Sequence, residues 1–337
     1  MNTILKFTPI LKTPIWGGTR LAPFKGLDTD LPKIGESWEV SDVTGDESVV
    51  SEGPLAGTTL RELLATHGRE ILGERLLRKF QGRFPLLIKF IDAEDRLSVQ
   101  VHPDDALAHR RHGTMGKTEM WYCLTPEPGA YLYAGLRAPL TPGQYRERIA
   151  TNTIVEALRR YDVHEGDVYY LPAGRVHAIG PGSLILEIQE TSDITYRIYD
   201  YDRRDAAGHP RQLHVAESLE AVDLSDTDGA LTRSRGPLRP GQPILLQHSE
   251  YFEATLLQLT AQQTLPLRSG DSFTVLIVTD GTLTLTLPDA ATPDAATPDA
   301  ADPVTLTRGS SALIPASATT LLATPTTPEA TLILVTA

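Results

Sequence analysis

The sequence predicts a mostly β fold with two small helical inserts. Most of the chain consists of short runs of alternating apolar and polar residues, broken by Gly, Pro and Asp, which is typical of strands joined by turns. Segments 97–102, 167–174 and 183–190 are examples. Two longer stretches, 59–80 and 141–161, instead carry their apolar residues at helical spacing, the first interrupted near Gly68.

The composition excludes several functional classes. The 337 residues include 43 acidic and 31 basic side chains, for a net charge of −12. A broad nucleic-acid surface needs a clustered basic field, so we expect none. No run approaches the roughly 18–20 apolar residues of a membrane span, and the N-terminal segment lacks a signal-peptide pattern. We therefore expect a cytoplasmic protein without membrane or nucleic-acid partners.

Length and a shift in composition predict two domains. At about 150 residues per domain, the length corresponds to roughly two. Beyond about residue 225, His248 is the last histidine, and Thr, Ala, Leu and Pro dominate. We place the boundary near residue 235, which divides the chain into domains 1–235 and 236–337.

Two local patterns stand out in the second domain. The run SFTVLIVTDGTLTLTL (272–287) predicts two strands in a hairpin that turns at Asp280-Gly281. The near-repeat PDAATPDAATPDAADP at 288–303 predicts a flexible loop, because proline at every fifth residue blocks both helix and sheet pairing.

Two segments of the first domain combine polar residues on one face. In a strand alternate residues share a face, so Ser98, Gln100 and His102 point one way from segment 97–102. Lys117 and Glu119 share a face in the same manner if their segment is a strand. Taken alone, both patterns are also typical of solvent-exposed strands.

The segment GDVYYLPAGRVH (166–177) is more specific. Its spacing of Gly166, Pro172, Gly174 and His177 resembles the second metal-binding motif of the cupin superfamily of small β-barrels. Gly166 allows the turn into a strand, and Pro172 and Gly174 shape the turn that follows it. His177 is then expected to point into the barrel. Pro181 replaces the Asn of the superfamily pattern, but that position is not a ligand.

Residues upstream of this motif complete a candidate metal site. The first cupin motif supplies His-x-His and a later Glu, and the corresponding element here is Gln100-x-His102 followed by Glu119. Gln100, His102, Glu119 and His177 would together hold a divalent metal. Two imidazoles, one carboxylate and one amide oxygen suit an ion such as zinc.

The segment 308–320 repeats the spacing of the motif at 166–177 but lacks its histidine. Gly309 and Pro315 recur at the same spacing, whereas Ser317 and Thr320 stand where the motif has its second Gly and its His. We therefore expect a second cupin-like barrel that binds no metal. The whole chain would then be a bicupin, with two jelly-roll β-barrels and small helical inserts.

Longer segments are similar to type I mannose-6-phosphate isomerases of the short bacterial form. The similarity extends in order over roughly residues 5–220 and lies in PIWGGTRL (14–21), GESWEVSD (35–42), PLLIKFIDAEDRLSVQVHPDD (85–105), GKTEMWY (116–122), GDVYYLPAGRVHAIG (166–180) and LEIQETSDITYRIYDYDR (186–203). This resemblance implies an enzyme that interconverts mannose 6-phosphate and fructose 6-phosphate through a cis-enediol. It also implies one zinc ion per chain, bound by the four residues named above.

The resemblance further assigns roles to residues outside the metal site. They are, for catalysis, Arg197, Lys117, Asp193 and Glu187 and, for substrate binding, Ser98 and Lys89. Arg197 is always cationic and could stabilise either the enediolate or the phosphate. Lys117, Glu187 and Asp193 are alternative candidates for the base that carries the proton.

Two other functions fit parts of the pattern. Two histidines and one carboxylate also form the iron(II) triad of cupin oxygenases, although Gln100, Lys117 and Arg197 suit a phosphosugar better. A non-catalytic sugar-phosphate sensor could use the same barrels, although a pure binder has less need of acid–base groups such as Lys117 and Asp193.

Overall fold

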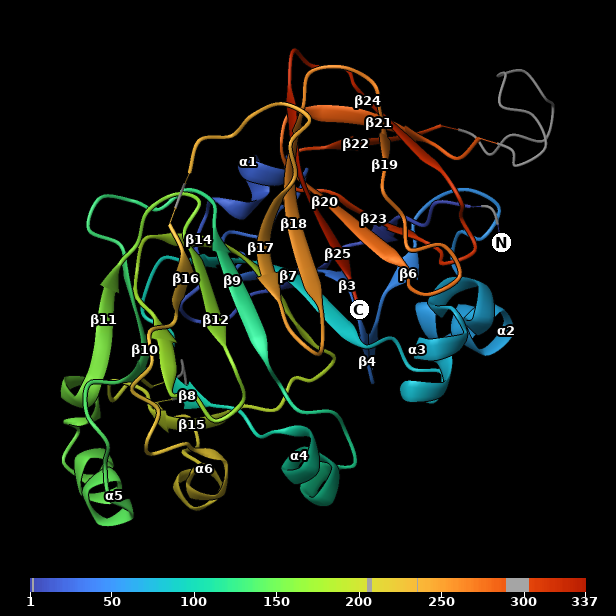
Figure 1. Cartoon of the computed structure of the whole chain (residues 1–337). Coiled ribbons are helices and arrows are strands. Elements are labelled where there is room, and N and C mark those ends of the chain that lie inside the picture. Colours follow the sequence, from blue (N-terminus) through green and yellow to red (C-terminus); the bar gives the residue numbers. More distant parts are fainter. Residues whose placement is uncertain (2, 205–207, 235, 289–302) are drawn as a thin grey trace.

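The chain is mostly β, as predicted, and its sheets stack in layers (Figure 1). The computed structural model describes residues 1, 3–204, 208–234, 236–288 and 303–337. Apart from its two end prolines, the predicted flexible loop at 288–303 lies outside the described residues. Among the helices of the described segments, none is long and apolar enough to span a bilayer.

The first half of the chain forms two main sheets. The larger one has the strand order β16-β12-β9-β14-β7-β3-β2, and the smaller one the order β11-β10-β13-β8-β15. The larger sheet consists of β2 (Ile10–Lys12), β3 (Glu36–Val40), β7 (Leu86–Ala93), β9 (Glu119–Cys123), β12 (Val168–Leu171), β14 (Ser183–Glu190) and β16 (Leu231–Arg233). The smaller sheet consists of β8 (Val99–Val101), β10 (Tyr131–Leu136), β11 (Leu158–Asp162), β13 (His177–Ile179) and β15 (Tyr196–Tyr199). Two short ribbons pair β1 (Phe7–Thr8) with β6 (Val49–Val50) and β4 (Asp42–Val43) with β5 (Asp46–Glu47).

The second half also forms two sheets, with the orders β17-β18-β25-β20-β23 and β19-β24-β21-β22. The first of them consists of β17 (Ile244–His248), β18 (Glu253–Leu259), β20 (Thr274–Asp280), β23 (Ser311–Ile314) and β25 (Ala330–Thr336). The second consists of β19 (Gln263–Leu265), β21 (Thr282–Thr286), β22 (Val304–Thr307) and β24 (Leu321–Pro325).

The strand orders of the two halves correspond one to one. The series β3-β7-β14-β9-β12 matches β17-β18-β25-β20-β23, and β8-β13-β10-β11 matches β19-β24-β21-β22. Along the chain, the matched strands also follow one another in the same sequence in both halves. The topology is therefore duplicated, with β2, β15 and β16 as additions to the first copy.

The predicted hairpin at Asp280-Gly281 is wrong, although both of its strands exist. β20 pairs with β23 and β25, whereas β21 pairs with β22 and β24. Gly281 (φ 77°) instead carries the chain from one sheet to the other. A Cβ atom there would lie 2.3 Å from the carbonyl oxygen of Glu329, so only glycine fits this crossing.

The first predicted helical insert is confirmed and the second is confirmed only in part. Segment 59–80 forms α2 (Leu60–Leu72), which is kinked at His67, and α3 (Glu74–Lys79); Thr59 begins α2 with a capping box. Segment 141–161 forms α5 (Pro142–Ala150) and the 3₁₀ helix η1 (Ile154–Ala157). Its remainder is β11 rather than helix, because Asn152 (φ 59°) turns the chain and residues 158–162 pair with β10.

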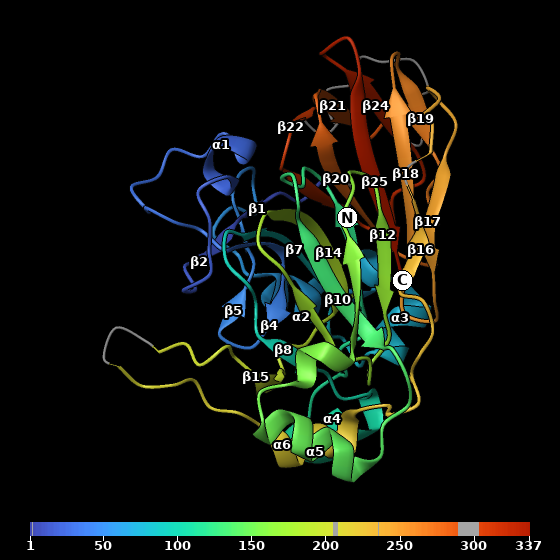
Figure 2. The same ribbon diagram turned by 90° about the vertical axis from the view of Figure 1, so that its left-hand side faces the viewer.

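Three further helices lie outside the predicted stretches. They are α1 (Leu21–Lys25), α4 (Asp105–His112) and α6 (Val215–Ala221). Each is short, and α4 buries only Leu107 and Ala108, so none has the apolar periodicity that predicts a helix. Figures 1 and 2 show α4, α5 and α6 together at the end of the molecule far from the sheets of the second half.

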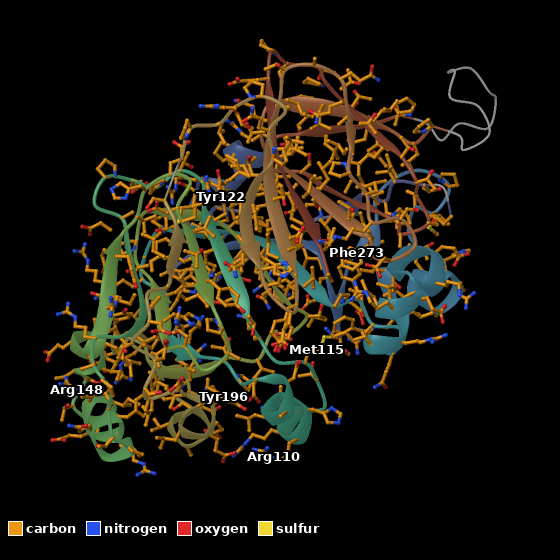
Figure 3. The ribbon with its side chains drawn as sticks, viewed as in Figure 1. Arg110, Met115, Tyr122, Arg148, Tyr196 and Phe273 are labelled. Atoms are coloured by element: carbon orange, nitrogen blue, oxygen red, sulfur yellow. The ribbon has the colours of Figure 1, made fainter. Side chains whose placement is uncertain are left out.

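The larger sheet of the first half is covered on both faces. On one face Leu86, Ile88 and Phe90 of β7 share a core with the second half, whose members include Phe273, Val275 and Ile333. The rings of Phe84 and Phe273, the latter labelled in Figure 3, lie 4.5 Å apart, centroid to centroid. The alternate residues of β7, among them Lys89, point to the other face, where they border a pocket.

We predict that Phe273→Ala lowers the free energy of unfolding by about 3–5 kcal/mol, because it opens a cavity in this shared core. Urea denaturation followed by circular dichroism should show one cooperative transition at a lower midpoint. The control Leu245→Ala, at a side chain 54% exposed, should stay within about 0.5 kcal/mol of the unmodified protein. A variant that loses only part of the signal at low urea would contradict a shared core.

Candidate functional site

Two rows of side chains line the space between the sheets of the first half. Strand register places the first row side by side on the larger sheet, in the order Trp38, Lys89, Glu187 and Trp121. The second row lies on the smaller sheet, in the order His177, Gln100 and Arg197. Tyr196, labelled in Figure 3, precedes Arg197 on β15 and marks this sheet near α4 and α6.

These rows border a solvent-open pocket of about 750 Å³. The predicted site residues that line it are Lys89, Ser98, Gln100, Lys117, Glu187, Asp193 and Arg197. His102 and His177 lie directly behind this lining. His102 Nε2 is 3.3 Å from Lys117 Nζ, and His177 Nε2 is 3.2 Å from Gln100 Nε2. Glu119 contacts both Lys117 and His177. The structure thus brings all of the sequence-predicted site residues together.

His102, Glu119 and His177 form a buried cluster. One ligand atom from each lies within 4.8 Å of the other two. Glu119 Oε1 is 3.2 Å from His177 Nε2, and Glu119 Oε2 is 3.7 Å from His102 Nε2. All three side chains are at most 1% exposed.

Both imidazoles are prepared to act as metal ligands. His102 Nδ1 lies 2.8 Å from the carbonyl oxygen of Ile194, and His177 Nδ1 lies 2.9 Å from that of Arg175. A carbonyl oxygen only accepts, so each Nδ1 carries the hydrogen and each Nε2 keeps its lone pair. Burial lowers the pKa of His177 to about 3 and that of His102 well below its usual value, so both rings are neutral.

Glu119 is the strongest sign that a cation belongs here. Among the described residues, no group hydrogen-bonds to either of its buried carboxylate oxygens. Burial raises the pKa of Glu119 to about 8 despite the nearby Lys117, which shows how poorly the surroundings alone support its negative charge. Two imidazole lone pairs and a buried carboxylate without a hydrogen bond among the described residues are donors that suit a divalent metal, and rotation of the Gln100 amide would present an oxygen to the same space.

Lys89 and Glu187 form a buried ion pair at the centre of the first row. Lys89 Nζ is 3.0 Å from Glu187 Oε2 and 4.0 Å from Glu36 Oε2. Glu187 also accepts a 2.8 Å hydrogen bond from Trp121 Nε1. Burial by itself would raise the pKa of Glu187, but Lys89 and then Lys117 outweigh it and lower the pKa to about 2. Glu187 is therefore a stable carboxylate.

Arg197 is a cation at the pocket that lacks a carboxylate partner of its own among the described residues. Its Nε donates to Ser98 Oγ at 3.3 Å and its Nη1 donates to the carbonyl oxygen of Gln212 at 3.0 Å. The neighbouring Arg211 instead forms an ion pair with Asp200. Burial, and then the charge of Arg211, lower the pKa of Arg197 from its usual value, yet a guanidinium stays protonated.

Sequence reasoning missed part of the pocket lining. Trp16, Glu36, Trp38 and Arg211 also border it. The sequence favours a packing role for the tryptophans, and both Trp16 and Trp38 are indeed buried, yet each also lines the pocket. Strand alternation in GESWEVSD places Glu36 and Trp38 on one face and could have signalled them, whereas Arg211 lies in a loop without periodicity.

The fold and the site define a mostly β protein with a candidate divalent-metal cluster behind a polar pocket. Residues 4–126 match the family model for the catalytic domain of type I phosphomannose isomerase. The mannose-6-phosphate isomerase ManA of Bacillus subtilis (strain 168) is 43% identical over 222 residues, which cover 65% of this chain and 68% of that protein. The mannose-6-phosphate isomerase of Streptococcus mutans is 39% identical over 256 residues, 75% of this chain and 79% of that protein.

A solved structure agrees with these sequence matches. The crystal structure of the mannose 6-phosphate isomerase from Bacillus subtilis aligns with a TM-score of 0.84 at 31% identity and covers 99% of both chains. The chain belongs to the type I phosphomannose isomerase family.

We predict that Glu119→Gln binds zinc at least about 10-fold more weakly than the unmodified protein, because it removes the only carboxylate of the cluster. Metal content after dialysis against a competing chelator, measured by mass spectrometry, tests this. The control Glu94→Gln changes a surface carboxylate paired with Lys33 and should retain its metal. Equal zinc retention by Glu119→Gln would remove Glu119 from the set of ligands.

Proposed function

We propose that this chain is a metal-dependent aldose–ketose isomerase that interconverts mannose 6-phosphate and fructose 6-phosphate through a cis-enediol. The curated relatives carry the name of this activity. The observation that carries the proposal is the buried cluster of His102, Glu119 and His177 in contact with Lys117, beside a pocket lined by Arg197.

Gln100, His102, Glu119 and His177 would hold one zinc ion per chain. A divalent ion there would supply a Lewis acid that polarises the sugar carbonyl and stabilises negative charge on the enediolate. The donor set supports this assignment, because both histidines are neutral and Glu119 has no hydrogen-bond donor of its own among the described residues.

Lys117 is the best-placed candidate to carry the proton between C1 and C2. Its Nζ lies 3.3 Å from both His102 Nε2 and Glu119 Oε2, and the side chain is buried. Glu187 is a weaker base, because its ion pair with Lys89 lowers its pKa to about 2. Asp193 lines the pocket but is exposed, which suits it to a proton transfer near solvent, such as opening of the sugar ring.

Arg197 and Ser98 are the best-placed residues to bind the phosphate group of the substrate. Arg197 has guanidinium donors that no described carboxylate uses, and Ser98 Oγ lies beside it. Lys89 also lines the pocket, but Glu187 and Glu36 already balance its charge. Lys89 would therefore contribute to substrate binding mainly by orienting Glu187.

We further propose that the fold is a bicupin, with a catalytic barrel in residues 1–235 and a metal-free barrel in residues 236–337. The matched strand orders support two jelly-roll barrels. In the first half, Glu119 of β9 pairs with Leu171 of β12. In the second half, Thr274 of β20 pairs with Ile314 of β23, so Thr274 occupies the position that corresponds to Glu119. Thr320 occupies the position of the motif histidine, so the second barrel lacks both of these ligands.

A phosphorylated hexose is the small-molecule partner that this proposal implies. Because phosphorylated sugars are charged and stay inside cells, we propose a cytoplasmic location. The net charge of −12 disfavours a nucleic-acid partner.

A coupled assay of mannose 6-phosphate conversion to fructose 6-phosphate tests the proposed activity. We expect turnover that is lost after chelation and restored by added zinc. Folded, metal-loaded protein without turnover would contradict the proposal. Tight binding of the sugar phosphate without turnover would then indicate a sensor, and oxygen consumption with iron(II) would indicate an oxygenase.

For Lys117→Met we expect kcat to fall by about 10²-fold or more, because the side chain can no longer transfer a proton. The zinc content should remain near that of the unmodified protein. The matched control Lys33→Met removes an exposed lysine paired with Glu94 and should leave kcat unchanged. Normal turnover by metal-loaded Lys117→Met would exclude Lys117 as the base.

A further inference from the structure

The loop at 113–118 carries Lys117 from α4 to β9. Met115 marks this loop beside α4 in Figure 3. Lys117 lies outside the paired part of β9, which begins at Glu119. The sheet ladder therefore does not fix the position of Lys117, and other contacts must hold it against the metal cluster.

Two carboxyl groups hold the backbone on both sides of Lys117. The amide of Gly116 donates to Asp105 Oδ1 at 2.8 Å, and the amide of Thr118 donates to Glu190 Oε2 at 2.7 Å. The amide of Lys117 itself donates to the carbonyl oxygen of Pro103 at 3.1 Å. Three successive amides are thus bonded to groups from α4, β14 and the segment that precedes α4.

The two carboxyl groups also interact with each other. Glu190 is 3% exposed, and its side chain hydrogen-bonds with that of Asp105. Burial, and then the charge of Asp105, raise the pKa of Glu190 to about 8, so Glu190 is mostly protonated at neutral pH. Tyr251 of the second half also lies near the pair, and burial raises its pKa, so it stays neutral.

The loop has no room to shift without moving its supports. A Cβ atom on Gly116 would lie 2.6 Å from the backbone nitrogen of Asp105, so the loop rests directly on the first turn of α4. Thr118 is further tied to β14 by the backbone bond from Glu190 N to Thr118 O at 3.1 Å. Lys117 can therefore be displaced only if these contacts are broken.

We propose that Asp105 and Glu190 are positioning residues that hold Lys117 in its reactive place through the amides on either side of it. This inference rests on the proposed isomerase function, in which Lys117 carries the proton. Displacement of a reacting group by about 1 Å can cost roughly 10²-fold in rate. Neither carboxyl group touches the pocket itself, so their effect should appear in kcat rather than in KM.

Alanine and amide variants distinguish this role from simple stabilisation. We expect Asp105→Ala and Glu190→Ala each to lower kcat by about 10-fold or more, with KM within about twofold and zinc content unchanged. Asp105→Asn and Glu190→Gln keep a carbonyl oxygen for the same amide and should retain kcat within about threefold. Unchanged kcat in both alanine variants would overturn the proposal. Loss of kcat in Asp105→Asn and Glu190→Gln as large as in the alanine variants would overturn it as well.

A double-mutant cycle tests whether the effect passes through Lys117. In the Lys117→Met background, Glu190→Ala should cause no further loss of kcat, because the group that it positions is gone. A full additional loss would show that Glu190 acts independently of Lys117 and would overturn the inference.

Asp104→Ala is the matched control. Asp104 neighbours Asp105 but caps α4 through the amide of Leu107 at 2.8 Å instead of bonding to the loop. It should lower the melting temperature without lowering kcat. If Asp104→Ala lowers kcat as much as Asp105→Ala does, general destabilisation of α4 explains the result and the proposal fails.

Hydrogen–deuterium exchange of peptide 113–119 gives a readout that does not depend on activity. Exchange should become faster in both alanine variants and stay unchanged in Asp104→Ala. If Glu190→Ala does not fold, the exposed Asp105 still provides the test. Absence of isomerase activity in the unmodified protein would contradict the proposed function, whereas unchanged exchange in the alanine variants would contradict the positioning role alone.

Discussion

Strand alternation in β7, β9 and β14 is the constraint on which the rest of the structure depends. All three strands are buried along their whole length. One set of alternate residues, such as Ile88 and Met120, packs against the second half, and the other set, such as Lys89 and Trp121, faces the pocket. A register slip of one residue would move charged groups into the core and leucines into the pocket. The same pairing that builds the core therefore places the site.

The two buried carboxyl groups of the site, Glu187 and Glu119, differ in the partners that stabilise their negative charge. Glu187 is compensated by Lys89 and by the indole of Trp121, so it stays ionised in spite of burial. Glu119 has Lys117 Nζ 3.3 Å away, but neither of its oxygens has a hydrogen-bond partner among the described residues, and two neutral imidazoles lie beside it. The pocket thus separates a carboxylate that the protein satisfies by itself from one that needs a cation, although both lie on adjacent strands of one sheet.

Local patterns in the sequence were enough to predict most of the residues that gather at the candidate site, but only part of the fold. The run at 183–190 has the bounds of β14, and the motif that ends in His177 led to upstream residues that do lie beside it. The Asp280-Gly281 turn has the local chemistry of a hairpin, but which sheet each strand joins depends on long-range packing. α4 has almost no apolar face, and the contact between Asp105 and Glu190 joins segments far apart in the chain, so no local pattern reveals either.

The position of β25 has a consequence for the order in which the molecule can form during synthesis. β25 follows every other strand of its sheet in the chain, yet it lies between β18 and β20 at the centre of that sheet. Until β25 emerges from the ribosome, β18 and β20 have no strand between them, so their sheet is incomplete. The apolar side of β7, β9 and β14 then has no complete sheet of the second half to pack against. During this interval the nascent first half exposes a hydrophobic surface. Chains in this state most readily aggregate or bind chaperones.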